Sequence, residues 1–292
     1  MNIVQRVSSL RAAVQAARKA KKTIGFVPTM GNLHEGHLEL VRAAKQRAEF
    51  VVVSIYVNPT QFGKHEDLGN YPSTPEEDAR SLAEQDADLL FLPEQQTMYP
   101  GAIDDQTVVY VPKIGDLYCG KDRPEHFYGV TTVVSRLFNM VQPDVAVFGN
   151  KDYQQIAIIR RMVEDLAYPI QVVGVDTVRS KEGLALSSRN GYLTDKQLLI
   201  APNLQALLKA MSEELKLNSA VKSKKAIKEL EDDAKAKLKK LGFKPQYVSV
   251  CEQHDLKPAK KGDTKLVILA AAQLGKSRLI DNIEVVLTGS DS

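Results

Sequence analysis

The chain has 292 residues, of which 43% are hydrophobic and 26% are charged, and its formal net charge is +3. This length allows a substantial core and two domains, whereas the small positive charge does not indicate a polynucleotide partner. No apolar run approaches the roughly 18 residues that cross a membrane, and the N-terminal segment lacks a signal-peptide core. Cys119 and Cys251 are not spaced as in a disulfide framework or a zinc site, so we expect a cytoplasmic protein without membrane or nucleic-acid partners.

A first helix is predicted where Leu10, Val14 and Ala17 recur at helical spacing, with Ser8 or Ser9 as its N-cap. Short apolar runs then begin to alternate with amphipathic patterns. Strands are predicted at residues 24–27, 51–57, 89–92, 145–148 and 170–175, and helices between several of them at 38–48, 75–85, 130–141 and 154–166. This alternation predicts an α/β domain with a Rossmann-like parallel sheet.

The pattern changes after about residue 188. We expect one long helix from Thr194 or Asp195 to about Leu217 and a Lys-rich one from about Ser219 to Leu241, followed by strands at 247–251, 265–270 and 283–287. Acidic residues are interspersed in the Lys-rich helix, which favours a solvated surface over a nucleic-acid site. We therefore predict a Rossmann-like domain over residues 1–185 and a smaller α+β C-terminal lid domain over 186–292.

The most informative motif is the segment from Pro28 to His37, PTMGNLHEGH, where a predicted strand passes into a helix. Open α/β sheets bind nucleotides at such junctions. His34 and His37 are three positions apart at the helix start, beside backbone N–H groups that the helix itself cannot satisfy. Gly36 has no Cβ and permits close approach to the backbone. The arrangement indicates a site for the phosphates of ATP.

This segment is not one of the commoner nucleotide-binding motifs, because the chain has no P-loop and no G-x-G-x-x-G fingerprint after a strand. H-x-G-H is instead typical of nucleotidylyl-transferases. Taken alone, the four residues are also compatible with two ordinary surface histidines, His34 and His37. The flanking strand and helix favour the nucleotide site.

A second cluster follows the next predicted strand, where Asn58 and Gln61 lie at its carboxyl end. Ligands bind at that edge of an open α/β sheet. The amide of Gln61 can donate to a substrate carboxylate or hydroxyl without adding charge, which suits a small polar acid next to an anionic triphosphate. The alternative interpretation is a turn, since Asn58-Pro59 is a common turn signal.

Two further clusters contain groups that bind phosphate. Gly149 and Lys151 follow another strand, and Lys151 is able to contact phosphate oxygens, although Lys151-Asp152 also suits a plain charge pair at a helix start. Gln155 lies one helical turn further and is expected to share a pocket with Gln61. The loop at 181–190 ends in Ser187, Ser188 and Arg189, a set of donors that can fold over a triphosphate; its alternative is a polar connection between domains.

Together and in this order, these clusters resemble the pantoate–β-alanine ligases, or pantothenate synthetases, over nearly the whole chain. The residues that carry the resemblance are Pro28 to His37, Val57-Asn58-Pro59 with Gln61-Phe62, Arg123-Pro124 with His126-Phe127, Phe148-Gly149 with Lys151-Asp152, Gln154-Gln155, Leu186 to Asn190, and Arg278 to Asn282. The resemblance implies a two-step reaction in which pantoate and ATP give pantoyl adenylate and pyrophosphate, and β-alanine then displaces AMP to form pantothenate.

The resemblance also implies the site residues. ATP contacts are expected from Met30, Gly31, His34, Gly36, His37, Gly149, Lys151, Asp152, Val178, Leu186, Ser187, Ser188 and Arg189. Gln61 and Gln155 are expected to bind pantoate, and Gln61 also β-alanine. His37 is the expected proton donor, and His34, Lys151 and Arg189 are expected to assist catalysis. Mg²⁺ is expected to be coordinated mainly by phosphate oxygens and water. The acidic residues Glu76, Glu77 and Asp78 are interpreted as a helix cap.

Departures from the family pattern are few. Asn150 stands where an acidic residue is common, Glu125 replaces a small residue, and Thr60 replaces a large apolar one. None of them removes an expected catalytic group. The family suggests a homodimer, with a strand around Tyr110–Val111 or the segment 118–128 at the interface.

Three rival interpretations are less consistent with the sequence. Another adenylyl- or cytidylyl-transferase would keep H-x-G-H but has no need for both Gln61 and Gln155. An aminoacyl-tRNA synthetase would require a tRNA-reading domain, for which the C-terminal part is too short and too mixed in charge. A non-catalytic nucleotide-binding module would tolerate loss of Lys151 or Arg189, and both are present.

Overall fold

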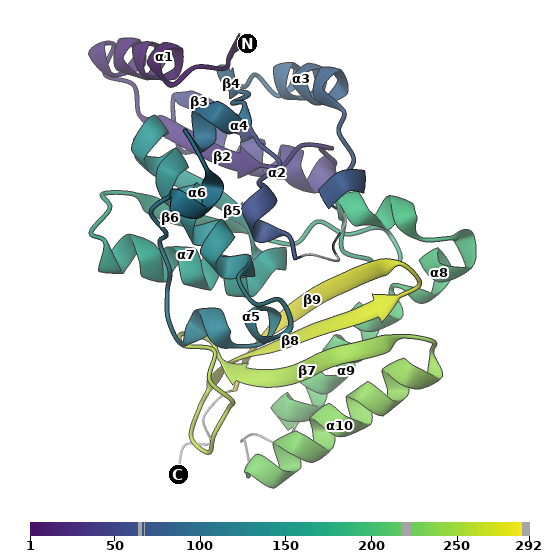
Figure 1. Cartoon of the computed structure of the whole chain (residues 1–292). Helices are drawn as coiled ribbons and strands as arrows, with labels where there is room; N and C mark the ends of the chain where they lie inside the picture. The colour runs from purple at the N-terminus through teal and green to yellow at the C-terminus, as the bar shows by residue number, and fades with distance from the viewer. Residues whose placement is uncertain (64–65, 67, 218–222, 288–292) are drawn as a thin grey trace. The chain divides into compact units, whose positions relative to one another are not determined.

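The computed structural model describes residues 1–63, 66, 68–217 and 223–287 (Figure 1). They form two compact units. The first unit comprises Met1–Asp116, Arg123–Asn150 and Ile158–Asp176, and the second comprises Leu117–Asp122, Lys151–Ala157 and the described residues from Thr177 onward. The domain boundary expected between residues 185 and 186 stays a prediction.

The first unit is built on a six-stranded sheet in which every strand pair is parallel. Its spatial order is β1-β4-β3-β2-β5-β6, with β1 at Asn2–Val4, β2 at Ile24–Thr29, β3 at Phe50–Ile55, β4 at Leu89–Phe91, β5 at Val145–Gly149 and β6 at Gln171–Val175. The predicted α/β class is confirmed, and each of the five predicted strands of this sheet is present.

Helices cover this sheet on both faces, as parallel sheets require. The longer ones are α1 (Val7–Lys19), α2 (Glu35–Lys45), α3 (Pro75–Glu84) and α6 (His126–Val141), with a short α4 at Gln95–Met98. Helix α7 (Tyr153–Asp165) belongs to this unit from Ile158 onward. Side-chain alternation along β2 separates the faces. The Phe26 ring packs edge-on against Phe138 of α6, 6.4 Å between centroids, whereas Val27 lies in the core cluster that contains Leu40 and Val41 of α2.

Two sequence predictions for the first unit need correction, and one strand was not predicted. The N-cap of α1 is Arg6 and not Ser8 or Ser9, and no side chain caps this helix. No strand forms at Tyr110–Val111; the Tyr110 ring stacks on Tyr128 instead, 3.8 Å between centroids. Strand β1 was not expected, because three residues are too few to show a period.

The second unit contains an antiparallel sheet of three strands in the order β7-β8-β9. The strands span Lys244–Glu252, Lys265–Leu274 and Ser277–Val286, and the longer helices are α9 at Asn203–Leu217 and α10 at Lys224–Lys240, with short helices α5 at Cys119–Asp122 and α8 at Asp195–Ile200. Helix α9 contacts β8 and β9, and α10 packs against β7 and α9. Their apolar faces enclose a core that includes Leu208, Leu238, Val248 and Ile268.

The expected long helix after Thr194 is in fact two helices. Thr194 is the N-cap of α8, where its hydroxyl accepts from the Gln197 N–H in a capping box. Pro202 follows α8, and α9 begins at Asn203. Because proline cannot donate the hydrogen bond that would continue the first helix, the segment divides there. Helix α10 begins after Ser223, and the expected start at Ser219 lies outside the described residues.

None of the described helices is long and apolar enough to cross a bilayer. Cys119 and Cys251 are both free thiols in the interior of the second unit. Burial raises the pKa of Cys251 to about 12, so this cysteine is protonated at neutral pH and is a poor nucleophile.

Glu125, one of the departures from the family pattern, has a strained backbone. It is the N-cap of α6 with φ +75° and ψ −18°, and its side chain makes no capping bond. The left-handed region costs a residue with a Cβ about 1–2 kcal/mol. We expect Glu125→Gly to raise the free energy of unfolding by about 1 kcal/mol, since glycine relieves the strain but also gains freedom in the unfolded chain.

The control for this prediction is Glu125→Ala, which removes the same charge but keeps a Cβ and therefore the strain. The measurement is urea unfolding, in which a shift of the transition midpoint at an unchanged slope of free energy against urea concentration reports a change in stability. The free energy of unfolding of the alanine variant should lie within about 0.5 kcal/mol of the parent value. An equal gain in both variants would show that charge, and not φ, is responsible.

Candidate active site

The two histidines of the H-x-G-H segment form a reciprocal cap at the start of α2. His34 is the N-cap, and its Nδ1 accepts from the backbone N–H of Gly36 at 3.1 Å. His37 Nδ1 accepts in turn from the backbone N–H of His34 at 3.3 Å. The two rings lie 4.1 Å apart between centroids. Two backbone donors that the helix itself cannot satisfy are thereby paired.

This cap fixes the protonation pattern of both rings. A ring nitrogen that accepts a hydrogen bond carries no proton, so the hydrogen of each neutral imidazole resides on Nε2. His34 and His37 therefore present Nε2 as a hydrogen-bond donor at the positive end of the α2 dipole. Such donors are suited to phosphate oxygens.

A buried carboxylate holds the turn that precedes the cap. Asp78 of α3 is 3% exposed, and it accepts from the backbone N–H groups of Asn32 at 2.9 Å and Leu33 at 2.8 Å. The hydroxyl of Thr74 donates to the same carboxylate at 3.1 Å. Asp78 is therefore more than the plain helix cap expected from the sequence, because it fixes the turn that leads to His34.

Gly31 makes the approach of Asp78 possible. Its φ is +83°, and a Cβ added there would lie 3.0 Å from both Asp78 Oδ2 and Ile55 Cγ2. A side chain at this position would be strained and would displace the carboxylate. Glycine is thus required by the turn itself, apart from any contact with nucleotide.

The side chain of Gln61 is oriented by a chain of buried polar groups. The Tyr99 hydroxyl donates to Asn58 Oδ1 at 2.9 Å, and Asn58 Nδ2 donates to the Gly129 carbonyl at 3.1 Å and to Gln61 Oε1 at 3.2 Å. Because its oxygen is occupied by Asn58, Gln61 presents the NH₂ end as a donor, and one of its two N–H groups contacts Met30 Sδ at 2.9 Å. This polarity suits a substrate carboxylate or hydroxyl. Thr60, a departure from the family pattern, joins the network by donating to Asn58 Oδ1 at 3.0 Å.

The backbone of Gln61 is held against the start of α6. A Cβ on Gly129 would lie 2.3 Å from the Thr60 carbonyl oxygen, so this close packing requires glycine. His126 Nδ1 donates to the Gln61 carbonyl at 2.8 Å, and Arg123 donates to the same oxygen at 3.3 Å. Arg123 and His126 of the R-P-x-H-F motif thus hold the backbone of Gln61 in place.

Arg123 is itself paired with Glu66, whose carboxylate it contacts at 2.6 Å through Nη2. Burial of the Glu66 carboxyl raises its pKa, but the hydrogen bonds and positive charge of Arg123 outweigh burial, and the net pKa is lowered. Glu66 therefore remains ionised at neutral pH and keeps the guanidinium in place.

In the second unit, Lys151 lies at the start of the segment that begins α7. The Asn282 side chain on β9 donates to the Lys151 carbonyl at 3.0 Å. Gln154 of α7 is buried and binds the segment around α5, accepting from Cys119 N–H at 3.0 Å and donating to the Leu117 carbonyl at 2.7 Å. Gln154 is thus structural, whereas the adjacent Gln155 is only partly buried.

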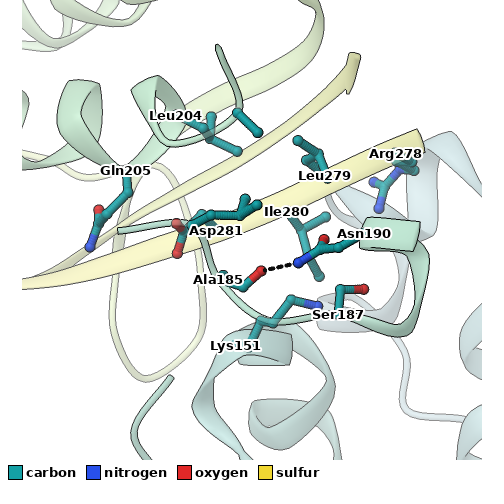
Figure 2. A pocket seen from close by; sticks show the side chains of 12 residues that line it. Lys151, Ala185, Ser187, Asn190, Leu204, Gln205, Arg278, Leu279, Ile280 and Asp281 are labelled. Carbon is teal, nitrogen blue, oxygen red and sulfur yellow. Dashed lines mark hydrogen bonds between the residues drawn. The ribbon is translucent and has the colours of Figure 1, made fainter. Parts of the chain in front are cut away.

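The loop between Val178 and Asn190 folds back on itself. Leu186 N–H donates to the Val178 carbonyl at 2.9 Å, and Gly183 occupies the turn with φ +101°. Ser187 then caps a 3₁₀ helix at Ser188–Tyr192 by accepting from the Arg189 N–H. Lys151, Ser187 and Asn190 line one pocket with Asp281 and Arg278 of β9 (Figure 2). The loop and Lys151 therefore belong to one site of the second unit.

The residues of the predicted site are distributed over both units. Met30, Gly31, His34, Gly36, His37, Gln61 and Gly149 lie in the first unit, and Lys151, Asp152, Gln155, Val178 and Leu186 to Arg189 lie in the second. A Cβ built on Gly149 has no described atom within 4 Å, so the space beside this glycine is open. The pocket expected to join Gln61 and Gln155 stays a prediction.

Sequence reasoning named Asp78, Asn58 and Asp281 but did not find the supporting roles that they have in the structure. Their signals in the sequence are weak, since an acidic residue in a first helical turn or an Asn-Pro pair has a commoner explanation.

Comparison with known proteins identifies the family of this chain. The sequence model of the pantoate-beta-alanine ligase family matches residues 2–284. The chain belongs to this family. The pantothenate synthetase of Pseudomonas aeruginosa (strain PAO1) is 50% identical over 287 residues, which are 98% of this chain and 100% of that protein. The pantothenate synthetase of Shewanella baltica is 49% identical over 95% of this chain and 96% of its own length.

Solved structures agree with the family assignment. Pantothenate synthetase from Thermus thermophilus superposes with a TM-score of 0.90 at 42% identity, covering 98% of this chain and 100% of that one. Pantoate-beta-alanine ligase from Francisella tularensis, solved with beta-gamma ATP and beta-alanine, superposes with a TM-score of 0.79 at 33% identity, and the match covers 97% of both chains. The predicted family, fold class and ligase activity are confirmed.

Asp78→Asn should weaken the nucleotide site without unfolding the first unit. One of the two carboxylate oxygens becomes an NH₂ group, which cannot accept from the backbone, so one buried N–H of the 31–33 turn loses its partner. We expect a loss of about 1–3 kcal/mol in the free energy of unfolding and an increase of at least about tenfold in the KM for ATP, because the turn leads directly to His34.

Glu77→Gln is a matched control, since Glu77 is exposed in the same helical turn. Thermal unfolding and steady-state kinetics of Glu77→Gln should match those of the parent. If Asp78→Asn lost stability while its KM for ATP stayed unchanged, Asp78 would be structural only.

Proposed function

We propose that this chain condenses pantoate with β-alanine at the expense of ATP, releasing AMP and pyrophosphate, through a pantoyl-adenylate intermediate. The observation that carries the proposal is the reciprocal cap of His34 and His37 at the start of α2, which presents two Nε2 donors where a phosphate chain binds. Family membership supports the assignment of the two organic substrates.

In the first step, a carboxylate oxygen of pantoate attacks the α-phosphorus of ATP, and the bond to the pyrophosphate oxygen breaks. A carboxylate and a triphosphate repel one another, so the protein has to position both and neutralise charge. We assign Nε2 of His34 and His37 to the phosphates, with His37 in its imidazolium form as the proton donor. Lys151 and Arg189 add positive charge to the leaving pyrophosphate.

Pantoate is assigned to Gln61 and Gln155. The Gln61 amide presents its NH₂ end because Asn58 occupies its oxygen, and a neutral donor binds a carboxylate without forming an ion pair that would reduce its nucleophilicity. The remaining ATP contacts are assigned to Met30, Gly31, Gly36, Gly149, Asp152, the backbone of Val178, and Leu186, Ser187 and Ser188.

In the second step, the neutral amine of β-alanine attacks the carbonyl carbon of the adenylate. The bond from this carbon to the AMP oxygen breaks, and the amine loses a proton. We assign Gln61 to β-alanine as well as to pantoate, since both substrates meet at the same carbonyl carbon.

We propose that Mg²⁺ enters with ATP. Among the described residues, no three or more His, Cys, Asp or Glu side chains are grouped to hold a metal ion, so phosphate oxygens and water would supply most of its ligands. When bound, Mg²⁺ neutralises part of the charge on the triphosphate. We further propose that the protein is a cytoplasmic homodimer; the reduced thiols of Cys119 and Cys251 support a reducing compartment.

The proposal is tested with pantoate labelled with ¹⁸O in its carboxylate. Purified protein is incubated with ATP and Mg²⁺, with and without β-alanine, and the products are identified by mass spectrometry. We expect pantoyl adenylate and pyrophosphate without β-alanine, and pantothenate together with ¹⁸O-labelled AMP when it is present. Unlabelled AMP, or ADP as product, would overturn the adenylate route, and no turnover by folded protein would overturn the ligase assignment.

His37→Gln should slow adenylate formation by at least about 100-fold, the usual size of general acid–base catalysis. Glutamine at the third helical position can still accept from the His34 N–H, as in an ordinary capping box, so the helix start is kept while the imidazole is lost. The measurement is single-turnover formation of pantoyl adenylate. The control is His254→Ala, which removes an exposed histidine of the second unit; near-parental adenylation in His37→Gln would exclude the assigned role.

A further inference from the structure

Strand β9 carries a buried carboxylate whose ion pair with a partly buried arginine holds the 178–190 loop. Asp281 is 4% exposed, and both of its oxygens accept from Arg179, each at 2.7 Å. The same guanidinium donates to the Gly183 carbonyl at 3.2 Å, across the turn of the loop. The bidentate geometry defines the direction of the Arg179 side chain as well as its distance. Asp281 therefore fixes the start and the turn of the loop whose end contains Ser187 and Arg189.

The next residue of β9 holds the other phosphate-binding segment. Successive side chains of a strand point to opposite faces, so Asn282 lies on the face opposite Asp281. Its amide donates to the Lys151 carbonyl at 3.0 Å. On the same face Glu284 accepts from the Tyr153 hydroxyl at 2.8 Å. The segment that contains Lys151 is thus attached to β9 at two points.

A third contact reaches the end of the loop. Ser277, at the start of β9, is fully buried, and its hydroxyl donates to the Arg189 carbonyl at 3.0 Å. Ser277 and Asp281 are four residues apart and share one face of the strand. One face of β9 therefore holds the loop at both ends, and the other face holds the Lys151 segment.

We propose that Asp281, Asn282 and Ser277 are positioning residues for ATP, and that β9 sets the spacing between Lys151 and the Ser187–Arg189 donors. The inference rests on the proposed function, which assigns these groups to the phosphates. None of the three β9 side chains is assigned a contact with substrate. They act on the backbone or on Arg179, and so determine where the phosphate-binding groups lie.

Stability alone does not account for this arrangement. Removing an aspartate and an arginine from water costs free energy that their attraction often fails to recover, and apolar residues of similar volume are commonly as stable. What a buried bidentate pair adds is a single defined geometry. That property matters for a loop whose donors have to meet phosphate oxygens, because a displacement of about 1 Å can cost about 100-fold in rate.

The test compares Asp281→Asn with Glu231→Gln. Glu231 of α10 is a partly buried carboxylate of the same unit that accepts from the Val250 N–H at 2.8 Å, so it is matched in chemistry but is not attached to β9. We measure pantoate-dependent ATP–pyrophosphate exchange, which reports adenylation alone. In Asp281→Asn we expect kcat/KM for ATP to fall about 10- to 100-fold, while KM for pantoate changes less than about threefold. Glu231→Gln should stay within about twofold of the parent.

Ser277→Ala is a milder second variant, since it removes one hydrogen bond to Arg189 and leaves the ion pair intact. We expect it to fold and to raise KM for ATP by about 3- to 10-fold. Parental KM for ATP in Ser277→Ala, or parental kcat/KM for ATP in folded Asp281→Asn, would overturn the inference. An equal loss in Glu231→Gln would also overturn it, because it would reveal a general effect of stability.

Failure of the proposed function is recognised separately. If the parent protein showed no pantoate-dependent exchange, the ligase assignment would fail whatever the variants did. Titration calorimetry with ATP and Mg²⁺ then tests the inference by itself. Weaker binding of ATP by Asp281→Asn and Ser277→Ala than by the parent and Glu231→Gln would support the role of β9, and equal binding by all four would overturn it.

Discussion

The backbone N–H groups at the start of α2 are the constraint on which the first unit depends. A helix cannot satisfy its own first donors, and here separate side chains take them in turn. At the helix start His34 and His37 accept from Gly36 and His34, and in the turn just before it Asp78 accepts from Asn32 and Leu33. Because the imidazoles accept through Nδ1, they present Nε2 as donors. The chemistry of the H-x-G-H motif thus follows from the capping of a helix.

Carboxylates that accept hydrogen bonds support functional segments at three places in the chain. Asp78, Glu66 and Asp281 are carboxylates that lie behind a functional segment, and each accepts hydrogen bonds that fix the segment or the arginine supporting it. A carboxylate suits this task because its two oxygens accept from two donors at once. Its burial is tolerated only when those donors are present. Such a group makes its segment rigid, and the cost of losing one donor keeps the arrangement unique.

Periodicity predicted the elements better than their ends. The strands of the parallel sheet and its helices were recovered because each buries an apolar face with a clear period. The predicted N-cap of α1 was wrong because Ser8 and Ser9 lie inside the helix. The break near Pro202 was not predicted because helical periodicity continues on both sides of it. Caps and breaks depend on one or two residues, and a pattern averaged over a dozen does not resolve them.

The supporting residues of the site were harder to predict for a different reason. Asp78 follows Glu76 and Glu77 in the same first turn, and nothing local distinguishes it from these exposed neighbours. Its partners Asn32 and Leu33 are 46 and 45 residues away, and Asp281 is separated from Arg179 by 102 residues. Contacts at such separations arise from tertiary packing, which a single sequence does not display.

Gln61 shows how a neutral side chain acquires a defined role. A free glutamine amide can rotate and offer either its oxygen or its NH₂ group. In this protein the Asn58 amide occupies the oxygen, and Asn58 is itself fixed by Tyr99 and the Gly129 carbonyl. An arginine in place of Gln61 would bind a carboxylate more tightly but would also withdraw charge from the attacking oxygen. A glutamine with fixed polarity binds the acid while leaving it nucleophilic, and its dependence on three buried neighbours explains why the supporting network is as specific as the glutamine itself.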